Sequence, residues 1–244
     1  LLTKNLFIKD INNKSIQVTN DFDIGIVNGD ANVHRHEFGI DKGIFWSPLG
    51  NYLAFYRKDQ TMVADYPLVD ITTRIASMKK DKYPMAGEIS EQVTLGVYNL
   101  KSGKTVYMKT SGPEDHYLTC ISWDPSEKFI YIAELNREQN QMKLNQYDAI
   151  SGNFIKTLFE EKNQKYVEPE HSLYFLKNKP NQFIWQSERD GFNHLYLYDN
   201  TGKLIKQVTK GNYVITDLIG LDQKEENLFA MSTMDSPLEN NLYK

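Results

Sequence analysis

The sequence predicts an all-β chain that forms part of a β-propeller built from four-stranded antiparallel blades. A strand–turn–strand unit recurs three times, and its turn glycines, Gly103, Gly152 and Gly202, lie 49 and then 50 residues apart. A repeat of about 50 residues is typical of propeller blades and other stacked β units. The 15 Tyr and 12 Phe residues, within a 40% hydrophobic composition, supply the core that such sheets need.

Each recurring hairpin follows from local residue preferences. The hairpins occupy residues 93–107, 144–155 and 194–205, where alternating Leu, Tyr and Val side chains suit half-buried strands. Asn or Asp opens each turn, and Gly supplies the positive φ that a tight reversal requires. We therefore assign the turn glycines a conformational role.

A second recurring unit, two strands around a Pro-containing turn, precedes each hairpin at 45–56, 121–133 and 173–186. The two units together make one four-stranded blade. Segments 5–19 and 214–243 resemble parts of further blades, which gives three complete repeats and two partial ones. Because closed propellers carry about four to eight blades, residues 1–244 are predicted to be part of a longer propeller domain, with blade remnants at both ends.

Composition excludes several classes of function. The net charge of −4 leaves no basic stripe for nucleic acid, and no apolar run approaches membrane-spanning length. The single cysteine, Cys120, cannot form an internal disulfide and is predicted to be a buried small hydrophobic residue. The first five residues show no signal-peptide pattern, and no cofactor is predicted.

Two long excursions interrupt the repeat, at residues 28–42 and 58–90, and such excursions often carry function. The insertion 58–90 mixes apolar side chains with the basic group 79–82. Its apolar residues predict that it packs against another surface, and one interpretation is an arm that folds back over its own blade.

The first excursion contains four consecutive ionisable residues, His34 to Glu37. His34 and His36 would share one face of a strand, but no third ligand follows at zinc-like spacing and Arg35 opposes a cation, so no metal site is predicted. Two interpretations remain open. The segment is either a solvated polar loop or a binding loop whose carboxylate pairs with a cationic group such as a peptide's α-amino terminus.

No catalytic residue is assigned. The sequence contains no Gly-x-Ser-x-Gly motif, which an α/β-hydrolase uses to present its serine nucleophile. His194 falls within a strand pattern and is predicted to be structural. The neighbouring carboxylates Glu160 and Glu161 are predicted to be solvated, which argues against a glycosidase.

Several motifs resemble a known family. They are Val33–Pro48, Asp65–Asp70, Tyr-Pro-Met-Ala-Gly at 83–87 and Ser-Glu-Arg-Asp-Gly-Phe-Asn-His-Leu-Tyr at 187–196. Together they resemble the propeller domain of the dipeptidyl peptidase IV branch of prolyl oligopeptidase-type serine peptidases, and within it the bacterial prolyl tripeptidyl aminopeptidases. The resemblance covers essentially the whole chain.

The resemblance implies an eight-bladed propeller that caps an α/β-hydrolase domain of the same chain, with that catalytic domain lying outside residues 1–244. Peptides with a free amino terminus would enter between the two domains and lose a dipeptide or tripeptide after proline. It also implies a homodimer, with the 58–90 insertion as a candidate contact, and a periplasmic, secreted or cell-surface location in a bacterium.

Dipeptidyl members of the family hold the substrate's ammonium group with paired glutamates, whereas this sequence has Arg35, His36 and a single carboxylate, Glu37. The resemblance therefore assigns substrate binding to Glu37, with Arg35 and His36 shaping the loop or touching substrate, and favours tripeptide release. The predicted function is the substrate-recognition and gating propeller of a proline-specific serine aminopeptidase. The alternative is a noncatalytic propeller that binds a protein or peptide.

Overall fold

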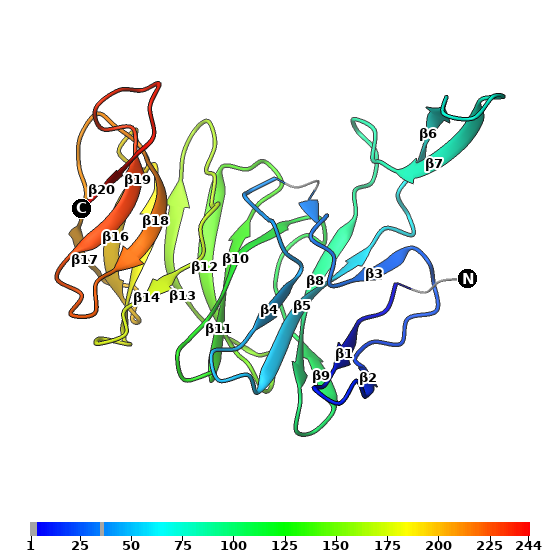
Figure 1. The fold of residues 1–244 in the computed structure, drawn as a ribbon, viewed down its shortest axis with the longest axis horizontal. Helices are drawn as coiled ribbons and strands as arrows, with labels where there is room; N and C mark the ends of the chain where they lie inside the picture. The colour runs from blue at the N-terminus through cyan, green and yellow to red at the C-terminus, as the bar shows by residue number, and fades with distance from the viewer. Residues whose placement is uncertain (1–3, 35–36) are drawn as a thin grey trace.

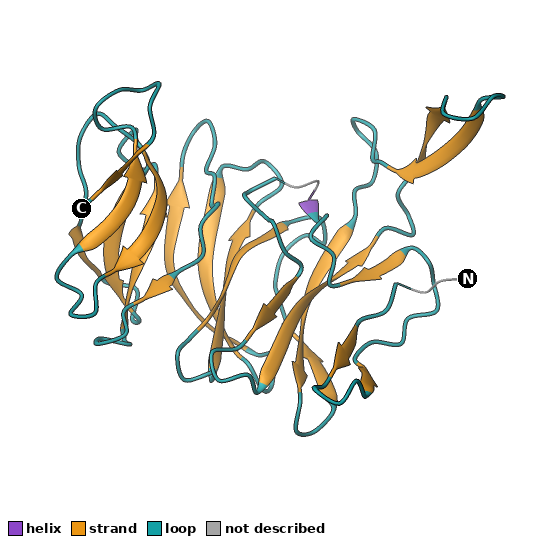
Figure 2. Cartoon of the chain, viewed as in Figure 1, coloured by secondary structure: helices purple, strands orange, loops and turns teal. Residues whose placement is uncertain are grey.

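The structure, a computed structural model, describes residues 4–34 and 37–244, and every strand in it pairs antiparallel with its neighbours (Figures 1 and 2). Three blades are present, and the second and third are regular. The second blade comprises β10 (Tyr117–Trp123), β11 (Phe129–Leu135), β12 (Gln141–Asp148) and β13 (Phe154–Lys162). The third blade comprises β14 (Tyr174–Phe175), β15 (Gln182–Ser187), β16 (His194–Asp199) and β17 (Leu204–Gln207). In both sheets the spatial order follows the chain order, as the sequence predicted for propeller blades.

Partial sheets lie at both ends of the described chain. Strands β1 (Phe7–Lys9) and β2 (Ser15–Gln17) form a hairpin beside the first blade. At the other end, β18 (Ile215–Leu221), β19 (Leu228–Ser232) and β20 (Asn241–Tyr243) form a three-stranded sheet. These are the segments in which the sequence predicted blade remnants, and the closed ring of eight blades stays a prediction.

The first blade has one strand more than the sequence predicted. It comprises β3 (Ile26–Asn28), β4 (Ile44–Trp46), β5 (Tyr52–Asp59), β8 (Gln92–Asn99) and β9 (Lys104–Tyr107). Strands β3 and β4 lie along the same edge of β5, with β4 pairing its first half and β3 its second. They are therefore two pieces of one edge strand, and the excursion that contains Glu37 leaves the sheet between them.

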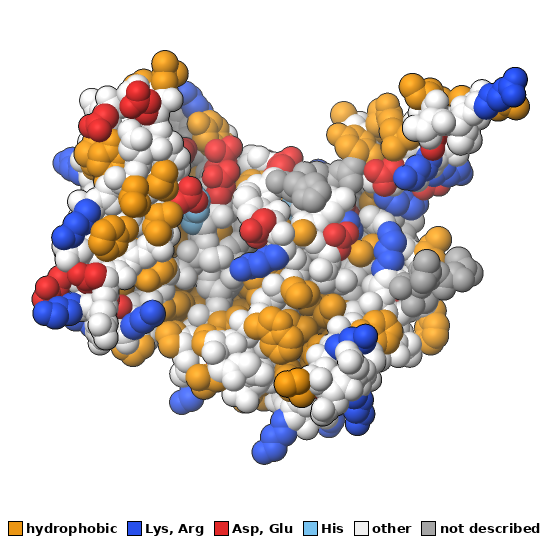
Figure 3. Space-filling view, viewed as in Figure 1, with side chains coloured by type: hydrophobic (Ala, Val, Ile, Leu, Met, Phe, Trp, Pro, Cys, Tyr) orange, Lys and Arg blue, Asp and Glu red, His pale blue; other side chains and the backbone are white. Residues whose placement is uncertain are grey.

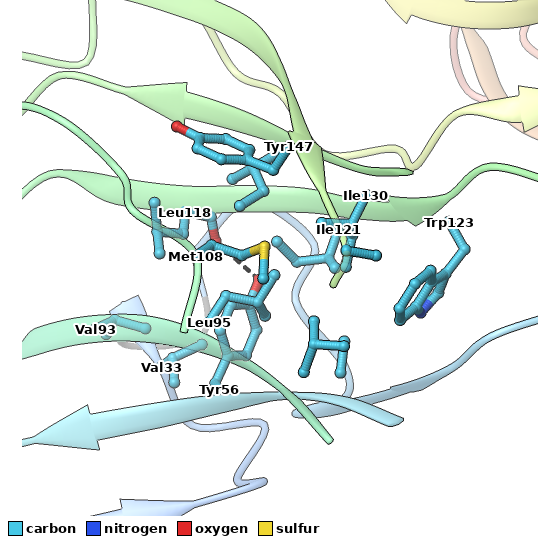
Figure 4. Packing of buried hydrophobic residues seen from close by; sticks show 14 residues of the cluster. Val33, Tyr56, Val93, Leu95, Met108, Leu118, Ile121, Trp123, Ile130 and Tyr147 are labelled. Atoms are coloured by element: carbon cyan, nitrogen blue, oxygen red, sulfur yellow. Dashed lines mark hydrogen bonds between the residues drawn. The ribbon is translucent and has the colours of Figure 1, made fainter. Parts of the chain in front are cut away.

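The hydrophobic core lies between blades rather than within any one of them. One large cluster joins β5 and β8 of the first blade to β10 and β11 of the second (Figure 4). Tyr56 crosses this interface, and its hydroxyl donates to the carbonyl oxygen of Leu118 at 2.8 Å. Trp123 crosses in the other direction, with its indole N–H donating to the Phe45 carbonyl oxygen at 3.0 Å. Because each sheet buries its face against the next, neighbouring blades fix one another's position.

Cys120 is buried in β10, as predicted, and burial raises the pKa of its thiol to about 12. Within residues 4–34 and 37–244, no helix is long and apolar enough to cross a membrane.

The 58–90 insertion forms an arm. Its strands β6 (Asp65–Asp70) and β7 (Ser77–Lys82) pair only with each other among the strands described, and the hairpin points away from the blades in Figure 1. The expectation that the arm folds back over its own blade is therefore wrong for the β6–β7 hairpin, whereas Tyr83, Pro84 and Ser90 at the end of the insertion lie beside residues of the blades. The hairpin stands apart because strand β5 of the blade ends at Asp59, before the strands of the arm begin, and the arm has only the strands β6 and β7. Within the described residues it has no third strand that could pair with the edge of the blade.

Candidate substrate-binding site

The loop that carries Glu37 is closed at its base. The Gly29 N–H donates to the carbonyl oxygen of Tyr56 at 2.8 Å, and the Tyr56 N–H donates to the carbonyl oxygen of Gly43 at 3.0 Å. A Cβ atom on Gly43 would lie 2.1 Å from the carbonyl oxygen of Asp30, so only glycine fits where the two ends of the loop meet. The loop therefore projects from the blade as one unit.

His34 anchors the loop just before Glu37. Its backbone N–H donates to Glu91 Oε1 at 2.7 Å, and its ring Nε2 accepts the Leu118 N–H at 3.1 Å. Burial, with smaller contributions from nearby positive charges, lowers the pKa of His34 to about 3, so the ring is neutral at physiological pH. Since Nε2 is occupied by the Leu118 N–H, His34 acts as a structural anchor here. Its carbonyl oxygen in turn accepts the Glu37 N–H at 3.1 Å.

The residues after Glu37 hold the loop from the other side. Phe38 is buried, and its ring lies 5.0 Å from that of Tyr117 between ring centroids. Gly39 has a positive φ of 63° and approaches Glu170 so closely that an added Cβ would lie 3.0 Å from the Glu170 carbonyl oxygen. The loop thus packs against the second blade and against the segment that leads to the third.

Glu37 itself is exposed between these two anchors. Its Oε2 accepts a hydrogen bond from Gln139 Nε2 at 3.1 Å, across 102 residues of sequence. A cavity of about 140 Å³ lies beside it. The lining consists of His34, Glu37, Tyr83, Pro84, Ser90, Tyr117 and Arg137. Arg35 and His36 lie outside the described residues, so their predicted roles stay predictions.

A larger cavity of about 420 Å³ lies between the ends of the second and third blades. Glu168 and Glu188 line it, and burial together with the charges of Glu168 and Glu170 raises the pKa of Glu188. Burial and the charge of Glu168 likewise raise the pKa of Glu170, which the Glu37 loop contacts through Gly39. Figure 3 shows acidic side chains gathered around the hollow between blades. Carboxylates concentrated in this way favour a cationic ligand.

Glu161 also lines this cavity, and here the prediction of a solvated carboxylate is wrong. Its side chain is only 11% exposed and forms an ion pair with Arg189. Trp185 Nε1 donates to Glu161 Oε1 at 2.7 Å, and the Ser187 hydroxyl donates to Oε2 at 2.8 Å. The neighbouring Glu160 faces the opposite side of β13 and is exposed, as predicted. Successive side chains of β13 point to opposite faces, and the two carboxylates differ in exposure because the third blade covers only the face on which Glu161 lies.

His194 has the geometry of a structural residue, as its strand pattern predicted. It is fully buried, with Nε2 2.9 Å from the carbonyl oxygen of Gly211 and Nδ1 3.1 Å from the hydroxyl of Thr209. The carbonyl can only accept, so Nε2 carries the proton and Nδ1 accepts the threonine hydroxyl hydrogen. Both ring nitrogens are thus used within the third blade.

Several residues of the site were not found from the sequence. Gln139, Tyr117 and Arg137 come from the second blade, and Glu168 and Glu170 from the segment that follows it. Gln139 does fall in a polar stretch between two strands, which marks a loop at a blade end. No residue pattern near Gln139 indicates that its loop faces the loop of Glu37, because the two are 102 residues apart in the sequence.

These features define a class of protein, a β-propeller domain with a carboxylate-bearing loop beside a cavity at one end of its blades. The chain belongs to the family described as the dipeptidyl peptidase IV (DPP IV) N-terminal region, which matches residues 1–244.

Solved structures and curated relatives agree with this family. A dipeptidyl peptidase 4 from Porphyromonas gingivalis superposes with a TM-score of 0.87 at 30% identity, covering 100% of this chain and 35% of that one. A candidate dipeptidyl aminopeptidase IV from Bacteroides ovatus gives the same TM-score of 0.87 at 44% identity, covering 95% of this chain and 34% of that one. Dipeptidyl aminopeptidase B of Saccharomyces cerevisiae is 27% identical over 251 residues, which cover 96% of this chain and 31% of the relative. The chain thus spans about a third of the length of these proteins.

The family also includes members named as inactive. Inactive dipeptidyl peptidase 10 of Mus musculus is 25% identical over 254 residues, which cover 96% of this chain and 31% of the relative.

Proposed function

We propose that this chain is the substrate-recognition and gating propeller of a proline-specific serine aminopeptidase, in which Glu37 anchors the α-amino group of the peptide. The observation that carries the proposal is the placement of Glu37, an exposed carboxylate on a loop anchored on both sides of it, beside a cavity. A carboxylate held in this way can accept charge-assisted hydrogen bonds from an ammonium group, which are stronger than neutral ones. The catalytic serine would come from an α/β-hydrolase domain of the same protein, as the family resemblance implies, and the relatives named above are named as peptidases.

The test is Glu37→Gln in the full-length protein, with chromogenic Ala-Ala-Pro and Gly-Pro substrates. We expect kcat/KM for free-amino substrates to fall roughly 30- to 100-fold, because the charge-assisted contact is lost while the shape of the side chain is kept. Substrates with acetylated amino termini should be turned over equally by the variant and the parent. We also expect the tripeptide substrate to be preferred, since a single carboxylate replaces the paired glutamates of the dipeptidyl pattern.

The matched control is Glu138→Gln, which removes an exposed carboxylate whose one side-chain hydrogen bond among the described residues is from Asn136, at 2.9 Å. It should leave kcat/KM unchanged. Unchanged kinetics in Glu37→Gln would refute the anchoring role of Glu37, and comparable turnover of Gly-Pro would refute the tripeptide preference.

A second candidate function is a noncatalytic propeller that binds a peptide or protein. The similarity to a mouse relative that is named as inactive supports this candidate. The same preparations distinguish the two. Peptide binding that depends on Glu37, without any hydrolysis or labelling by a serine-directed fluorophosphonate, would favour the noncatalytic function. A periplasmic, secreted or cell-surface location belongs with the peptidase proposal and rests on the family resemblance.

The arm formed by the 58–90 insertion is proposed as a homodimer contact. Val69 and Met78 are opposite one another across the β6–β7 hairpin and are 66% and 70% exposed. Further exposed apolar residues of the arm are Tyr66, Leu68, Ile71, Ile75 and Met85. Exposed apolar clusters of this kind are typical of interaction sites.

If the arm forms the contact, the full-length protein should be a dimer in light scattering at micromolar concentration, and Val69→Lys with Met78→Lys should convert it to a monomer. Ile150→Lys places the same charge on an exposed apolar turn residue of the second blade and should leave the dimer intact. A parent protein that is monomeric under these conditions would exclude the proposal.

A further inference from the structure

Gln139 lies at the turn between β11 and β12, beside Glu37. We propose that Gln139 is a positioning residue, whose side-chain amide orients the single carboxylate of Glu37 so that one oxygen is held and the other receives a cationic ligand group. The inference rests on the proposed function of Glu37 and names a second residue that shapes the same site.

The backbone of Gln139 is fixed on both sides. Its N–H donates to the Asn136 carbonyl oxygen at 2.9 Å, and its own carbonyl oxygen accepts the Val167 N–H at 2.8 Å. Its φ is +56°, a left-handed conformation that few non-glycine residues adopt. A long, polar side chain is thus held in a strained backbone position next to the site, and this cost requires compensating contacts.

The side-chain amide supplies such contacts. Nε2 of Gln139 donates to Glu37 Oε2 at 3.1 Å and to the Tyr117 hydroxyl oxygen at 3.2 Å, so both amide hydrogens are used. The same hydroxyl accepts from Arg137 Nη1 at 2.6 Å. Since both lone pairs of the Tyr117 oxygen are occupied, its hydrogen is left to be donated into the cavity that Tyr117 lines with Glu37.

The chemistry of the amide suits this role. A neutral donor orients a carboxylate without neutralising it, whereas a lysine or arginine at the same position would compete with a ligand's ammonium group. Glu37 Oε1 has no hydrogen-bond partner among the described residues. Among the described residues the carboxylate is therefore held through Oε2 alone, beside a second hydrogen-bond donor, Tyr117.

The test compares Gln139→Asn and Gln139→Leu in the full-length protein. Asparagine keeps the amide and tolerates a left-handed backbone, but it is one methylene too short to reach Glu37. Leucine keeps the approximate size and removes the donor. The readout is the dissociation constant, by calorimetry, of the tripeptide Ala-Ala-Pro and of its N-acetylated form.

We expect both variants to bind free-amino Ala-Ala-Pro about tenfold more weakly, the change expected when a hydrogen bond to a charged group is lost. Binding of the acetylated peptide should not change. The matched control is Gln141→Asn. It shortens a second glutamine of the second blade, whose Nε2 donates to a different carboxylate, Glu160 Oε2, at 3.3 Å. This control should bind both peptides as the parent does.

Three outcomes would overturn the inference, and they differ in what else they overturn. If Glu37→Gln weakens binding of the free-amino peptide but both Gln139 variants bind normally, positioning by Gln139 is wrong and the proposed function stands. If the Gln139 variants weaken both peptides equally, Gln139 acts only through local structure. If Glu37→Gln itself binds both peptides normally, the proposed anchoring by Glu37 fails and positioning by Gln139 fails with it.

Discussion

Replacing Gly152 by alanine is expected to destabilise the protein by about 2–4 kcal/mol, the sum of a left-handed backbone penalty and a steric clash. Gly152 has a φ of +71°, and an added Cβ would lie 2.3 Å from the carbonyl oxygen of Tyr107. Tyr107 belongs to β9 of the preceding blade, so the clash involves backbone that cannot rotate away. The Lys109 N–H also donates to the Gly152 carbonyl oxygen at 2.9 Å, and this contact between blades would be displaced.

The repeat itself supplies the control for this prediction. Gly103 occupies the equivalent turn of the first blade with a φ of +67°, but an added Cβ would meet only the Tyr98 hydroxyl at 3.8 Å. Gly103→Ala should therefore cost about 1–2 kcal/mol, the conformational penalty alone. Thermal unfolding of the two variants side by side measures the difference. Equal losses would show that the blade-to-blade approach at Gly152 contributes nothing.

The turn glycines show what local sequence can and cannot predict. Their conformational role follows from the Asx-to-Gly pattern, and all three do have positive φ. Their packing role does not follow from that pattern. Gly152 and Gly202 each lie against the outer strand of the preceding blade, with Gly202 so close that a Cβ would lie 2.1 Å from the Leu158 carbonyl oxygen. That contact depends on how one sheet is placed on the next, which no single hairpin encodes.

The same distinction between local pattern and packing explains why strand β3 of the first blade was not predicted from the sequence. The blade strands were found because they alternate in hydrophobicity or flank recognisable turns. Strand β3 has three residues, all of them buried, and therefore has no alternation to detect. It is recognisable only through its partner β5, whose far half would otherwise have an unpaired edge.

The candidate site was predicted in part for a related reason. Glu37 could be selected from the sequence, because a dense group of ionisable residues interrupted a regular repeat and resembled a family motif. Gln139 and Glu170 could not, because they reach Glu37 and its loop from positions more than a hundred residues away. Only the stacking of the first blade on the second, through residues such as Tyr56 and Leu118, brings these loops together.

Glu161→Gln should destabilise the protein by about 2–3 kcal/mol, because it leaves the Arg189 guanidinium, whose side chain is only 29% exposed, without its counter-charge. Burial alone would lower the pKa of Arg189, but the charge of Glu161 and the Tyr198 hydroxyl outweigh it and raise the pKa. The Arg189 guanidinium also lies over the ring of Tyr196, 4.3 Å from its centroid. Glutamine can still accept from Trp185 but cannot balance this charge.

Adjacent residues on β13 provide the control. Glu160 forms an ion pair with Lys162 at 3.1 Å, and both side chains are well exposed. Glu160→Gln should hardly change the midpoint of thermal unfolding, because solvent screens such pairs. The two variants thus differ by one position in the sequence and by the face of the strand on which the carboxylate lies.

A double-mutant cycle separates the ion pair from the rest of the network. If the loss in Glu161→Gln comes from an uncompensated Arg189, then Arg189→Met in the same protein should recover part of the lost stability, and the double variant should be more stable than the sum of the two single losses predicts. Strict additivity would instead assign the effect of Glu161 to its hydrogen bonds with Trp185 and Ser187, which Arg189→Met leaves in place. Because Glu161 and Arg189 join β13 to the third blade, the recovered stability would measure how far charge pairing, beyond apolar packing, holds these two blades together.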